Sequence, residues 1–234
     1  MPSNIKCILT DIEGTTTSIS FVYDVLFPYF KEHINELKSL TQNNQVIEAF
    51  SEVKKIVSDE ENQELTSDDQ VIEKLLQWSN EDRKITPLKT LQGILWKEGY
   101  VNGILKGHVY EDVPLALRQL QEEGICFAVF SSGSVAAQKL IFGFSDHGDL
   151  TPYFNAYFDT TSGMKRDSIT YTKIAKELGY LPNEILFLSD IYQELEAAEL
   201  AGMKTTQILR KGTEKAWKKT AVDFVEVRDS LDSI

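Results

Sequence analysis

The chain has few cysteines and more acidic than basic residues. Only Cys7 and Cys126 occur in 234 residues, and each sits in an apolar run. A disulfide between them is possible in principle, but such positions favour two buried structural thiols, and no Cys/His spacing resembles a zinc site. Lys plus Arg total 24 against 36 Asp plus Glu, a net charge of −12. This balance argues against nucleic acid or an anionic membrane as partner, because either would need a basic face.

The sequence also lacks long hydrophobic runs and Asn-x-Ser/Thr sequons. No apolar stretch approaches the ~20 residues needed to cross a bilayer. The polar N-terminus leads directly into the first apolar run, which predicts that there is no signal peptide. We therefore expect a location in the reducing cytosol, with the nucleus left open. The length of 234 residues fits one large domain or a core domain with an insertion.

The strongest signal lies in residues 5–17. A short apolar, β-prone run ends in two carboxylates one residue apart, Asp11 and Glu13, and Gly14 with three threonines follows at once. Buried carboxylates are costly unless a cation or a proton compensates them. A strand that ends on paired acids and turns into a Gly/Thr loop therefore predicts a phosphate and metal site.

Residues 19–107 read as a helical insertion without a convincing strand. Apolar residues recur there at helical spacing. The expected helices are 23–37, 46–57, one capped by Asp68 or Asp69, and one that starts at Thr86 and ends at Gly99. The acidic stretch 58–73 between two of them is predicted to be a solvated loop.

Helix and strand alternate in the last part of the chain. The expected helices are 114–123, 135–142 capped by Ser134, 171–178 capped by Thr170, and 193–201, and the expected strands are 125–130, 185–188, 205–209 and 224–227. Helices that stop at glycine before an apolar strand are typical of a parallel sheet covered on both faces. We therefore expect a Rossmann-like, doubly wound α/β core from 1–18 and 108–234, with an all-α domain at 19–107 inserted after the first strand.

Three of the predicted strands end in polar side chains. Ligands of open parallel sheets bind beyond the carboxyl ends of the strands, so these side chains should converge. They are Asp11 with Glu13, Ser131 with Ser132, and Ser189 with Asp190. Asp11 and Asp190 could share a divalent cation, and hard oxygen ligands favour Mg²⁺.

Further residues could complete such a site. The Ser131 hydroxyl and the backbone N–H groups of 132–134 could hold phosphate oxygens at a helix N-terminus. Lys165, in a loop, could neutralise the remaining charge. Glu194, one turn into the next helix, could orient Lys165 or a metal-bound water.

The order and spacing of these motifs resemble the haloacid-dehalogenase superfamily of phosphatases. The resemblance rests on Asp-x-Glu-Gly-Thr at 11–15, a strand ending in serine, a downstream Lys165 and a strand ending in Ser189-Asp190. It covers the whole chain, although most members have Asp where Glu13 stands. The stretch 131–143 and Met-Lys at 164–165 are similar to the enolase-phosphatase family within it.

That resemblance implies a Rossmann-like core with a helical C1-type cap and a Mg²⁺-dependent reaction in methionine salvage. The implied substrate, 2,3-diketo-5-methylthiopentyl-1-phosphate, is enolised and then dephosphorylated to 1,2-dihydroxy-3-keto-5-methylthiopentene, an acireductone. It also implies a monomer with one Mg²⁺ per chain. The implied roles are nucleophile for Asp11, acid and base for Glu13, substrate contact for Ser131, Ser132 and Lys165, and metal ligation for Asp11, Glu13 and Asp190. Glu13 is also our hypothesis for the base of the enolisation.

Two other functions stay open at this point. One is a plain small-molecule phosphatase of the same superfamily, such as a phosphoglycolate-type enzyme, against which Glu13 and the Ser-Ser-Gly-Ser stretch argue. The other is a binding protein on a degenerate phosphatase fold. Loss of Asp11 or Asp190 would mark that case, and both are present.

Overall fold

The computed structural model describes residues 4–231 and divides into two compact units. The core unit is Met1–Ile19 with Lys106–Ile234, and the helical unit is Ser20–Leu105. The helical unit is thus one insertion in the core unit. Its role as a cap stays a prediction.

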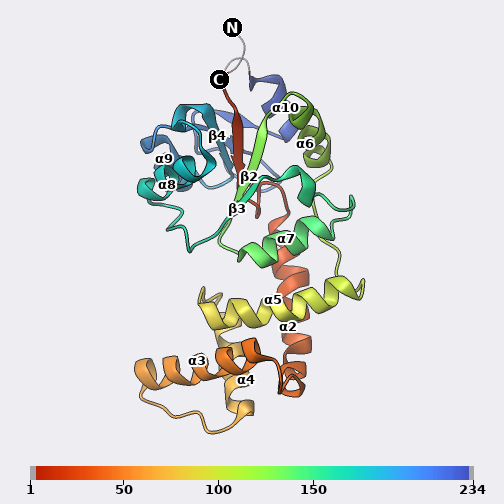
Figure 1. Cartoon of the computed structure of the whole chain (residues 1–234), viewed down its shortest axis with the longest axis vertical. Coiled ribbons are helices and arrows are strands. Elements are labelled where there is room, and N and C mark those ends of the chain that lie inside the picture. The colour runs from red at the N-terminus through yellow and green to blue at the C-terminus, as the bar shows by residue number, and fades with distance from the viewer. Residues whose placement is uncertain (1–3, 232–234) are drawn as a thin grey trace. The chain divides into compact units, whose positions relative to one another are not determined.

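The core unit is built on a six-stranded parallel sheet with the order β3-β2-β1-β4-β5-β6 (Figure 1). The strands are β1 Cys7–Thr10, β2 Cys126–Phe130, β3 Ala156–Phe158, β4 Ile185–Ser189, β5 Lys204–Ile208 and β6 Thr220–Ala221. Thr10 pairs with Val129 of β2 and with Leu188 of β4, so the carboxyl ends of these three strands lie side by side. The expected parallel α/β fold is confirmed.

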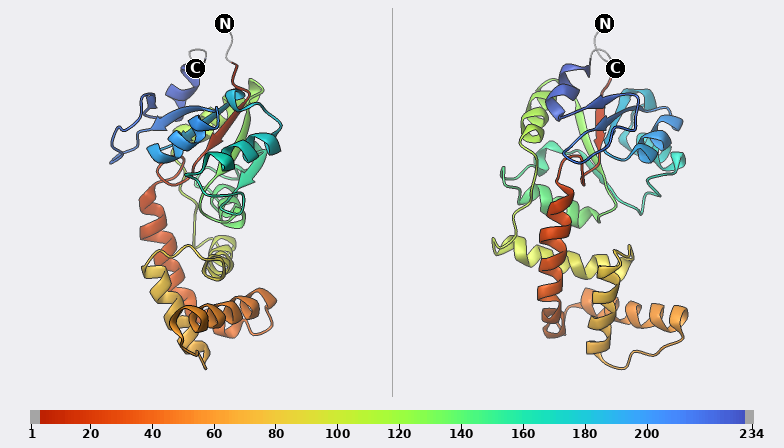
Figure 2. Two further views of the ribbon diagram at one scale, coloured as in Figure 1. Left: turned by 90° about the vertical axis from the view of Figure 1, so that its left-hand side faces the viewer. Right: turned by 180° about the vertical axis from the view of Figure 1, so that it is seen from behind.

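Helices cover both faces of this sheet, as the two further views also show (Figure 2). They are α6 Asp112–Glu122, α7 Val135–Gly143, α8 Ser168–Leu178, α9 Tyr192–Leu200 and α10 Phe224–Asp229, with short 3₁₀ turns η3 Thr151–Tyr153 and η4 Pro182–Glu184. The face under α8 and α9 buries Leu9, Phe130, Phe187, Tyr171 and Leu195 in one apolar cluster. This packing fixes the strand ends that carry the polar side chains.

The helical unit has a hydrophobic core of its own. Its elements are α1 Ile19–Phe21, a π-helical turn η1 Val22–Leu26, α2 Phe27–His33, a 3₁₀ turn η2 Ile34–Ser39, α3 Asn44–Glu61, α4 Asp68–Asn80 and α5 Thr86–Val101. Phe30, Val53, Leu75, Trp78 and Leu91 are buried together between them. The amphipathic patterns of 19–107 therefore reflect helix packing. Among residues 4–231, none of the helices has the length and apolarity that a membrane span requires.

The chain leaves and re-enters the core unit at neighbouring positions. The Thr17 hydroxyl donates to the carbonyl of His108 at 2.9 Å, and the Ser18 N–H donates to Nδ1 of His108 at 3.1 Å. The Tyr110 N–H donates to the carbonyl of Thr16 at 3.0 Å. The two connecting segments are thus hydrogen-bonded to each other next to the end of β1.

One strand prediction is wrong. Residues 224–227 form the start of helix α10, because Asp223 caps it by accepting the Glu226 N–H at 2.7 Å. Phe224 and Val227, one helical turn apart, are the buried residues of this helix. The short edge strands β3 and β6 had no predicted counterpart.

Several helix ends differ from expectation. Helix α8 is capped by Asp167, not by Thr170, which lies buried inside it. Helix α4 is capped by Ser67 rather than by an aspartate, and α3 extends to Glu61, so the acidic stretch 58–73 is mostly helical. Helix α5 continues past Gly99 to Val101. Gly99 has a packing role, since a Cβ there would lie 2.7 Å from the Tyr29 ring.

The two cysteines are free thiols on neighbouring strands. Cys7 of β1 is the register partner of Cys126 of β2. Cys7 is buried and Cys126 is only half-buried. The expectation of two free thiols is confirmed, but that of two buried ones holds for Cys7 alone.

Candidate active site

Asp11 follows β1 directly and is held in place by its own backbone and by the next residue. Its N–H donates to the Leu188 carbonyl of β4 at 2.9 Å, which continues the sheet ladder. The Ile12 N–H donates to Oδ1 of Asp11 at 2.7 Å. Asp11 is 4% exposed. A carboxylate is thus presented, almost buried, at the centre of the sheet edge.

Lys165 lies between two carboxylates. Its Nζ is 2.7 Å from Oδ1 of Asp11 and 2.7 Å from Oε2 of Glu194. Burial lowers the pKa of Lys165, but the charges of Asp11 and Glu194 outweigh burial and raise it overall. The Tyr171 hydroxyl donates to the Lys165 carbonyl at 2.7 Å and so fixes this loop on α8. Lys165 is therefore a fixed ammonium beside Asp11.

Glu194 is positioned from the first turn of α9. It accepts a hydrogen bond from the Ser189 hydroxyl at 3.0 Å, and that hydroxyl is also 3.5 Å from Oδ2 of Asp11. Burial, followed by the charge of Asp11, raises the pKa of Glu194 to about 7, against the opposing effect of Lys165. Glu194 thus orients Lys165, as the sequence suggested, and Ser189 joins the same network.

Asp190 follows β4 and has a side chain that is only partly satisfied. Its N–H donates to the Thr15 hydroxyl at 3.1 Å, and its carbonyl accepts from the Gln207 amide at 2.9 Å. Within the described part of the chain, Oδ1 of Asp190 is buried without a hydrogen-bond partner. Burial, then the charges of Asp11 and Glu13, raises the pKa of Asp190 to about 7. A cation bound to this oxygen would compensate for the burial of the Asp190 carboxylate and for the negative charges of Asp11 and Glu13.

The loop after β1 turns tightly against Asp190. The Ile12 carbonyl accepts the N–H groups of Thr15, Thr16 and Thr17 at 3.1, 2.9 and 2.9 Å. Gly14 has a φ of +76°, and a Cβ built on it would lie 2.4 Å from Oδ2 of Asp190. The Gly/Thr composition of this loop therefore has two causes, the left-handed turn and the close approach of the carboxylate. Glu13, half-buried, projects from the same loop.

The serine-rich loop after β2 is pre-organised at the start of α7. Ser131 is 3% exposed, and its hydroxyl accepts the Gly133 N–H at 3.1 Å. Ser134 caps α7 by accepting the Ala137 N–H at 3.3 Å, as predicted. The Gln138 amide donates to the Gly133 carbonyl at 2.9 Å. Ser132 is half-buried in this loop.

The structure thus joins Asp11, Lys165 and Glu194 directly and places Asp190, Glu13, Ser131 and Ser132 on adjacent strand ends. Sequence reasoning missed the Thr15 hydroxyl as the support of Asp190, although the threonine-rich loop signalled it. It also missed Gln207, whose position inside β5 gives no sequence signal.

The donor set fits Mg²⁺. Among residues 4–231, no three His, Cys, Asp or Glu side chains are grouped to hold a metal. Mg²⁺ needs no such group, because it is commonly bound by one or two carboxylates with waters and substrate phosphate. Asp11 and Asp190 provide the two carboxylates, and the partnerless Oδ1 of Asp190 is the atom that a cation would satisfy.

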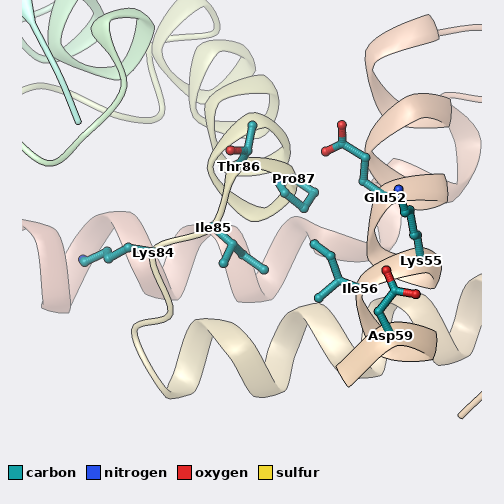
Figure 3. A pocket seen from close by; sticks show the side chains of 8 residues that line it. All are labelled: Glu52, Lys55, Ile56, Asp59, Lys84, Ile85, Thr86 and Pro87. Carbon is teal, nitrogen blue, oxygen red and sulfur yellow. The ribbon is translucent and has the colours of Figure 1, made fainter. Parts of the chain in front are cut away.

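A pocket in the helical unit is a weaker candidate. It has a volume of about 530 Å³ and lies between α3 and the segment before α5 (Figure 3). Ile56, Ile85 and Pro87 supply its apolar lining. Its four charged side chains, Glu52, Lys55, Asp59 and Lys84, are exposed. The pocket therefore offers no buried polar group to fix a ligand.

The fold and the strand-end acids are those of a hydrolase family. Residues 5–202 match the model of the haloacid dehalogenase-like hydrolases. Among solved structures, the UTR4 protein from Saccharomyces cerevisiae has a TM-score of 0.78 and 31% identity, over 94% of this chain and 98% of that one. CbbY from Rhodobacter sphaeroides, solved with phosphate, has a TM-score of 0.61 at 15% identity over 98% and 100% of the chains, a likeness of fold alone.

Named relatives identify one family within these hydrolases. Enolase-phosphatase E1 of Pseudomonas fluorescens is 49% identical over 96% of this chain and 97% of its own length. The protein of the same name from Thioalkalivibrio sulfidiphilus is 52% identical over 88% of this chain and 91% of its own. The chain therefore belongs to the enolase-phosphatase E1 family of haloacid dehalogenase-like hydrolases.

Proposed function

We propose that the protein is a Mg²⁺-dependent acireductone synthase of methionine salvage. It converts 2,3-diketo-5-methylthiopentyl-1-phosphate to 1,2-dihydroxy-3-keto-5-methylthiopentene and phosphate. The family membership supports the reaction, and the single observation that carries the chemistry is the contact of Lys165 with Asp11 at 2.7 Å. A buried carboxylate paired with a fixed ammonium is suited to attack an anionic phosphate ester.

Asp11 is proposed as the nucleophile. Its oxygen forms a bond to phosphorus while the ester P–O bond breaks, which gives an aspartyl-phosphate and an enolate oxygen. Glu13 donates a proton to that leaving oxygen and then takes one from the water that hydrolyses the aspartyl-phosphate. Two easier displacements thus replace one difficult displacement.

Lys165 and the serine loop are proposed to hold the phosphoryl group. The Lys165 ammonium supplies positive charge next to Asp11, and Glu194 keeps it in place. The Ser131 and Ser132 hydroxyls provide donors for phosphoryl oxygens, and so do the backbone N–H groups of 132–134 once the Gly133 N–H exchanges the Ser131 hydroxyl for a phosphoryl oxygen. The Ser131 hydroxyl is held by the Gly133 N–H before substrate binds, so this group is already in place.

Asp11, Asp190 and Glu13, the last through its side chain or its carbonyl, are proposed to hold one Mg²⁺. When bound, this ion supplies charge neutralisation at the transferring phosphoryl group and polarises the diketone. The fit rests on the partnerless carboxylate oxygen of Asp190. For the enolisation, which precedes dephosphorylation, we propose that Glu13 is the base that takes the proton next to the carbonyl, while the enolate oxygen takes a proton from solvent water; Glu13 then holds the proton that it donates to the leaving oxygen.

The helical unit is proposed to be a C1-type cap that excludes water when substrate binds. Phosphate mimics should then protect the exposed residues 101–104 from limited proteolysis. Equal cleavage with and without the mimic would contradict this role. We also predict that the protein is a monomer and that it lies in the cytosol. Light scattering of the purified protein tests the oligomeric state.

Two parallel assays test the reaction. The purified protein is incubated with the diketone phosphate, and enol absorbance and free phosphate are followed separately, with Mg²⁺ and with EDTA. We expect both signals with Mg²⁺ and neither phosphate nor turnover with EDTA. Phosphate without an enol would indicate a plain phosphatase, and the absence of both with Mg²⁺ would indicate a binding protein.

The variant Asp11→Asn assigns the nucleophile, because it keeps the shape of the side chain and removes its charge. Phosphate release should fall to background while the circular dichroism spectrum is retained. Asp69→Asn, an exposed position in the helical unit, is the matched control. Retained phosphatase activity in Asp11→Asn would overturn the assignment.

A further inference from the structure

Arg210 lies just beyond β5 and binds the loop that follows β1. Its Nε donates to the Thr15 carbonyl at 3.0 Å. Its two terminal nitrogens donate to the two carboxylate oxygens of Asp112, each at 2.8 Å. The side chains of Arg210 and Asp112 are only 8% and 16% exposed. All three nitrogens of the guanidinium thus donate hydrogen bonds, and the ion pair is nearly buried.

Asp112 and Tyr110 anchor this guanidinium from the other side. Asp112, the first residue of α6, also accepts the Phe224 N–H of α10 at 2.9 Å. The guanidinium carbon of Arg210 lies 4.0 Å from the centre of the Tyr110 ring. The Tyr110 N–H in turn donates to the Thr16 carbonyl at 3.0 Å. Arg210 therefore reaches the loop after β1 both directly and through Tyr110.

The same loop supports the metal-ligand candidate of β4. The hydroxyl of Thr15, whose carbonyl Arg210 holds, accepts the Asp190 N–H at 3.1 Å. Thr15 is completely buried, so its side chain has little freedom apart from its backbone. A shift of the Thr15 backbone would therefore be transmitted to Asp190.

We infer that Arg210 is a positioning residue of the active site, which acts on Asp190 through Thr15. This inference rests on the proposed function. Asp112 is its buried counter-ion. A lysine cannot replace Arg210, because an ammonium on a flexible stem cannot form the bidentate pair and bind the Thr15 carbonyl at the same time. The consequence is that an ion pair without substrate contact sets the affinity for the cation.

Mg²⁺ binding to the full chain tests this inference. MgCl₂ is titrated calorimetrically into the wild-type protein and into Arg210→Lys and Asp112→Asn, without substrate. Outer-shell partners of metal ligands typically change affinity or activity by about 10- to 100-fold, so we expect Kd for Mg²⁺ to rise about 10-fold in both variants. In assays at saturating Mg²⁺, kcat should fall by a similar factor, with KM within about twofold.

The chain offers a matched control in Arg228, which pairs with Glu123 at 2.8 Å on the exposed surface of the same unit. Arg228→Lys should bind Mg²⁺ like the wild type. Circular dichroism and melting curves establish that each variant is folded at the assay temperature. Folded variants with wild-type Kd and kcat would overturn the inference, and so would failure of both Arg210→Lys and Asp112→Asn to fold, since the pair would then be only a fold element. Failure of the proposed function would show separately, as absence of phosphate release by the wild type.

Discussion

Gly14 lies directly against the carboxylate of Asp190, because a Cβ at Gly14 would stand 2.4 Å from Oδ2 of Asp190. No rotation of a methyl group relieves such a contact. The atoms in contact belong to the Asp190 side chain, so a methyl group at Gly14 would push this carboxylate out of its position. Gly14 thus leaves the space in which the Asp190 carboxylate lies.

The first prediction concerns Gly14→Ala. The variant should lose about 100-fold in kcat, since a displacement near 1 Å in a catalytic site has that order of effect. Gly179→Ala is the control, because Gly179 has nearly the same φ, +78°, at the end of α8, with nothing within 4 Å of the methyl group that alanine would add. Both variants should melt earlier, and only Gly14→Ala should lose turnover. Equal kcat values for the two would contradict the prediction.

The second prediction concerns the pair of Lys165 and Glu194. Lys165→Met leaves Asp11 and Glu194 buried without their counter-ion, so in metal-free protein the free energy of unfolding should fall by about 3–5 kcal/mol. Adding Glu194→Gln should restore part of that loss, because it removes one of the stranded charges. Denaturant unfolding of the single and double variants measures this coupling. Strictly additive losses would rule the coupling out.

The same variants separate stability from catalysis. Lys165→Met should lose kcat/KM by about two orders of magnitude or more, as loss of a preorganised donor does. The double variant should recover stability without recovering turnover. A double variant that regains turnover would show that Lys165 acts only through folding.

The third prediction concerns pH. Burial, helped by the charge of Asp11, raises the pKa of Asp190 and of Glu194 to about 7. The folded protein therefore holds protons that the unfolded chain has released above its ordinary carboxyl pKa values near 4. Protonation stabilises the fold, so this contribution is present at low pH and is lost as pH rises toward 7.

Melting curves in EDTA between pH 5 and pH 8 measure this effect, with Asp190→Asn as the control that cannot titrate at this position. The wild type should lose stability relative to Asp190→Asn as pH rises. Added Mg²⁺ should stabilise the wild type more at pH 8 than at pH 5, because it binds the deprotonated carboxylates. A pH-independent difference between the two proteins would contradict the raised pKa of Asp190.

The fourth prediction concerns the neighbouring thiols. A hydrogen bond from Cys7 lowers the pKa of Cys126, while the same interaction and burial raise that of Cys7. Cys126 is half-buried and Cys7 is buried. A thiol reagent should therefore modify Cys126 quickly and Cys7 slowly in the native protein, and both quickly in denaturant. Cys126→Ser should remove the fast phase, and a fast phase that persists would contradict the assignment.

The sequence alone predicts the parts of the fold that have strong local signals. Asp11 and Asp190 follow β1 and β4, strands of four and five residues that are apolar except for their last residues, Thr10 and Ser189, and that read as buried strands. The Ser134 cap has the residue type and the position that helix starts prefer. The parallel sheet, the helical insertion and the acidic strand ends follow from such signals.

Other features depend on tertiary packing. Strands β3 and β6 have three and two residues, too short for a periodic pattern. Phe224, Val225 and Val227 are apolar and β-prone, yet the Asp223 cap and the burial of Phe224 and Val227 on one helical side favour helix α10. Both Asp167 and Thr170 are acceptable caps, and only the packing of Thr170 inside the unit selects Asp167.

The residues of the candidate active site also differ in how far the sequence predicts them. Residue types and strand order predict Asp11, Asp190 and Lys165 as partners in one site. The orientation of Lys165 toward Glu194, and the support of Asp190 by Thr15 and Gln207, join positions far apart in the chain. For Glu194 the sequence left Lys165 and a metal-bound water as two options. It offers only the threonine-rich loop as a signal for Thr15 and none for Gln207, so tertiary packing decides these contacts.

The hydrogen bonds from Thr17 and Ser18 to His108 have a consequence for protein engineering. They close the base of the insertion, so the backbone on either side of residues 20–105 is already in register without the segment between. A short glycine-containing turn could span that junction, and foreign insertions could be grafted there. The core unit thus keeps its own hydrogen-bonded junction on both sides of the insertion.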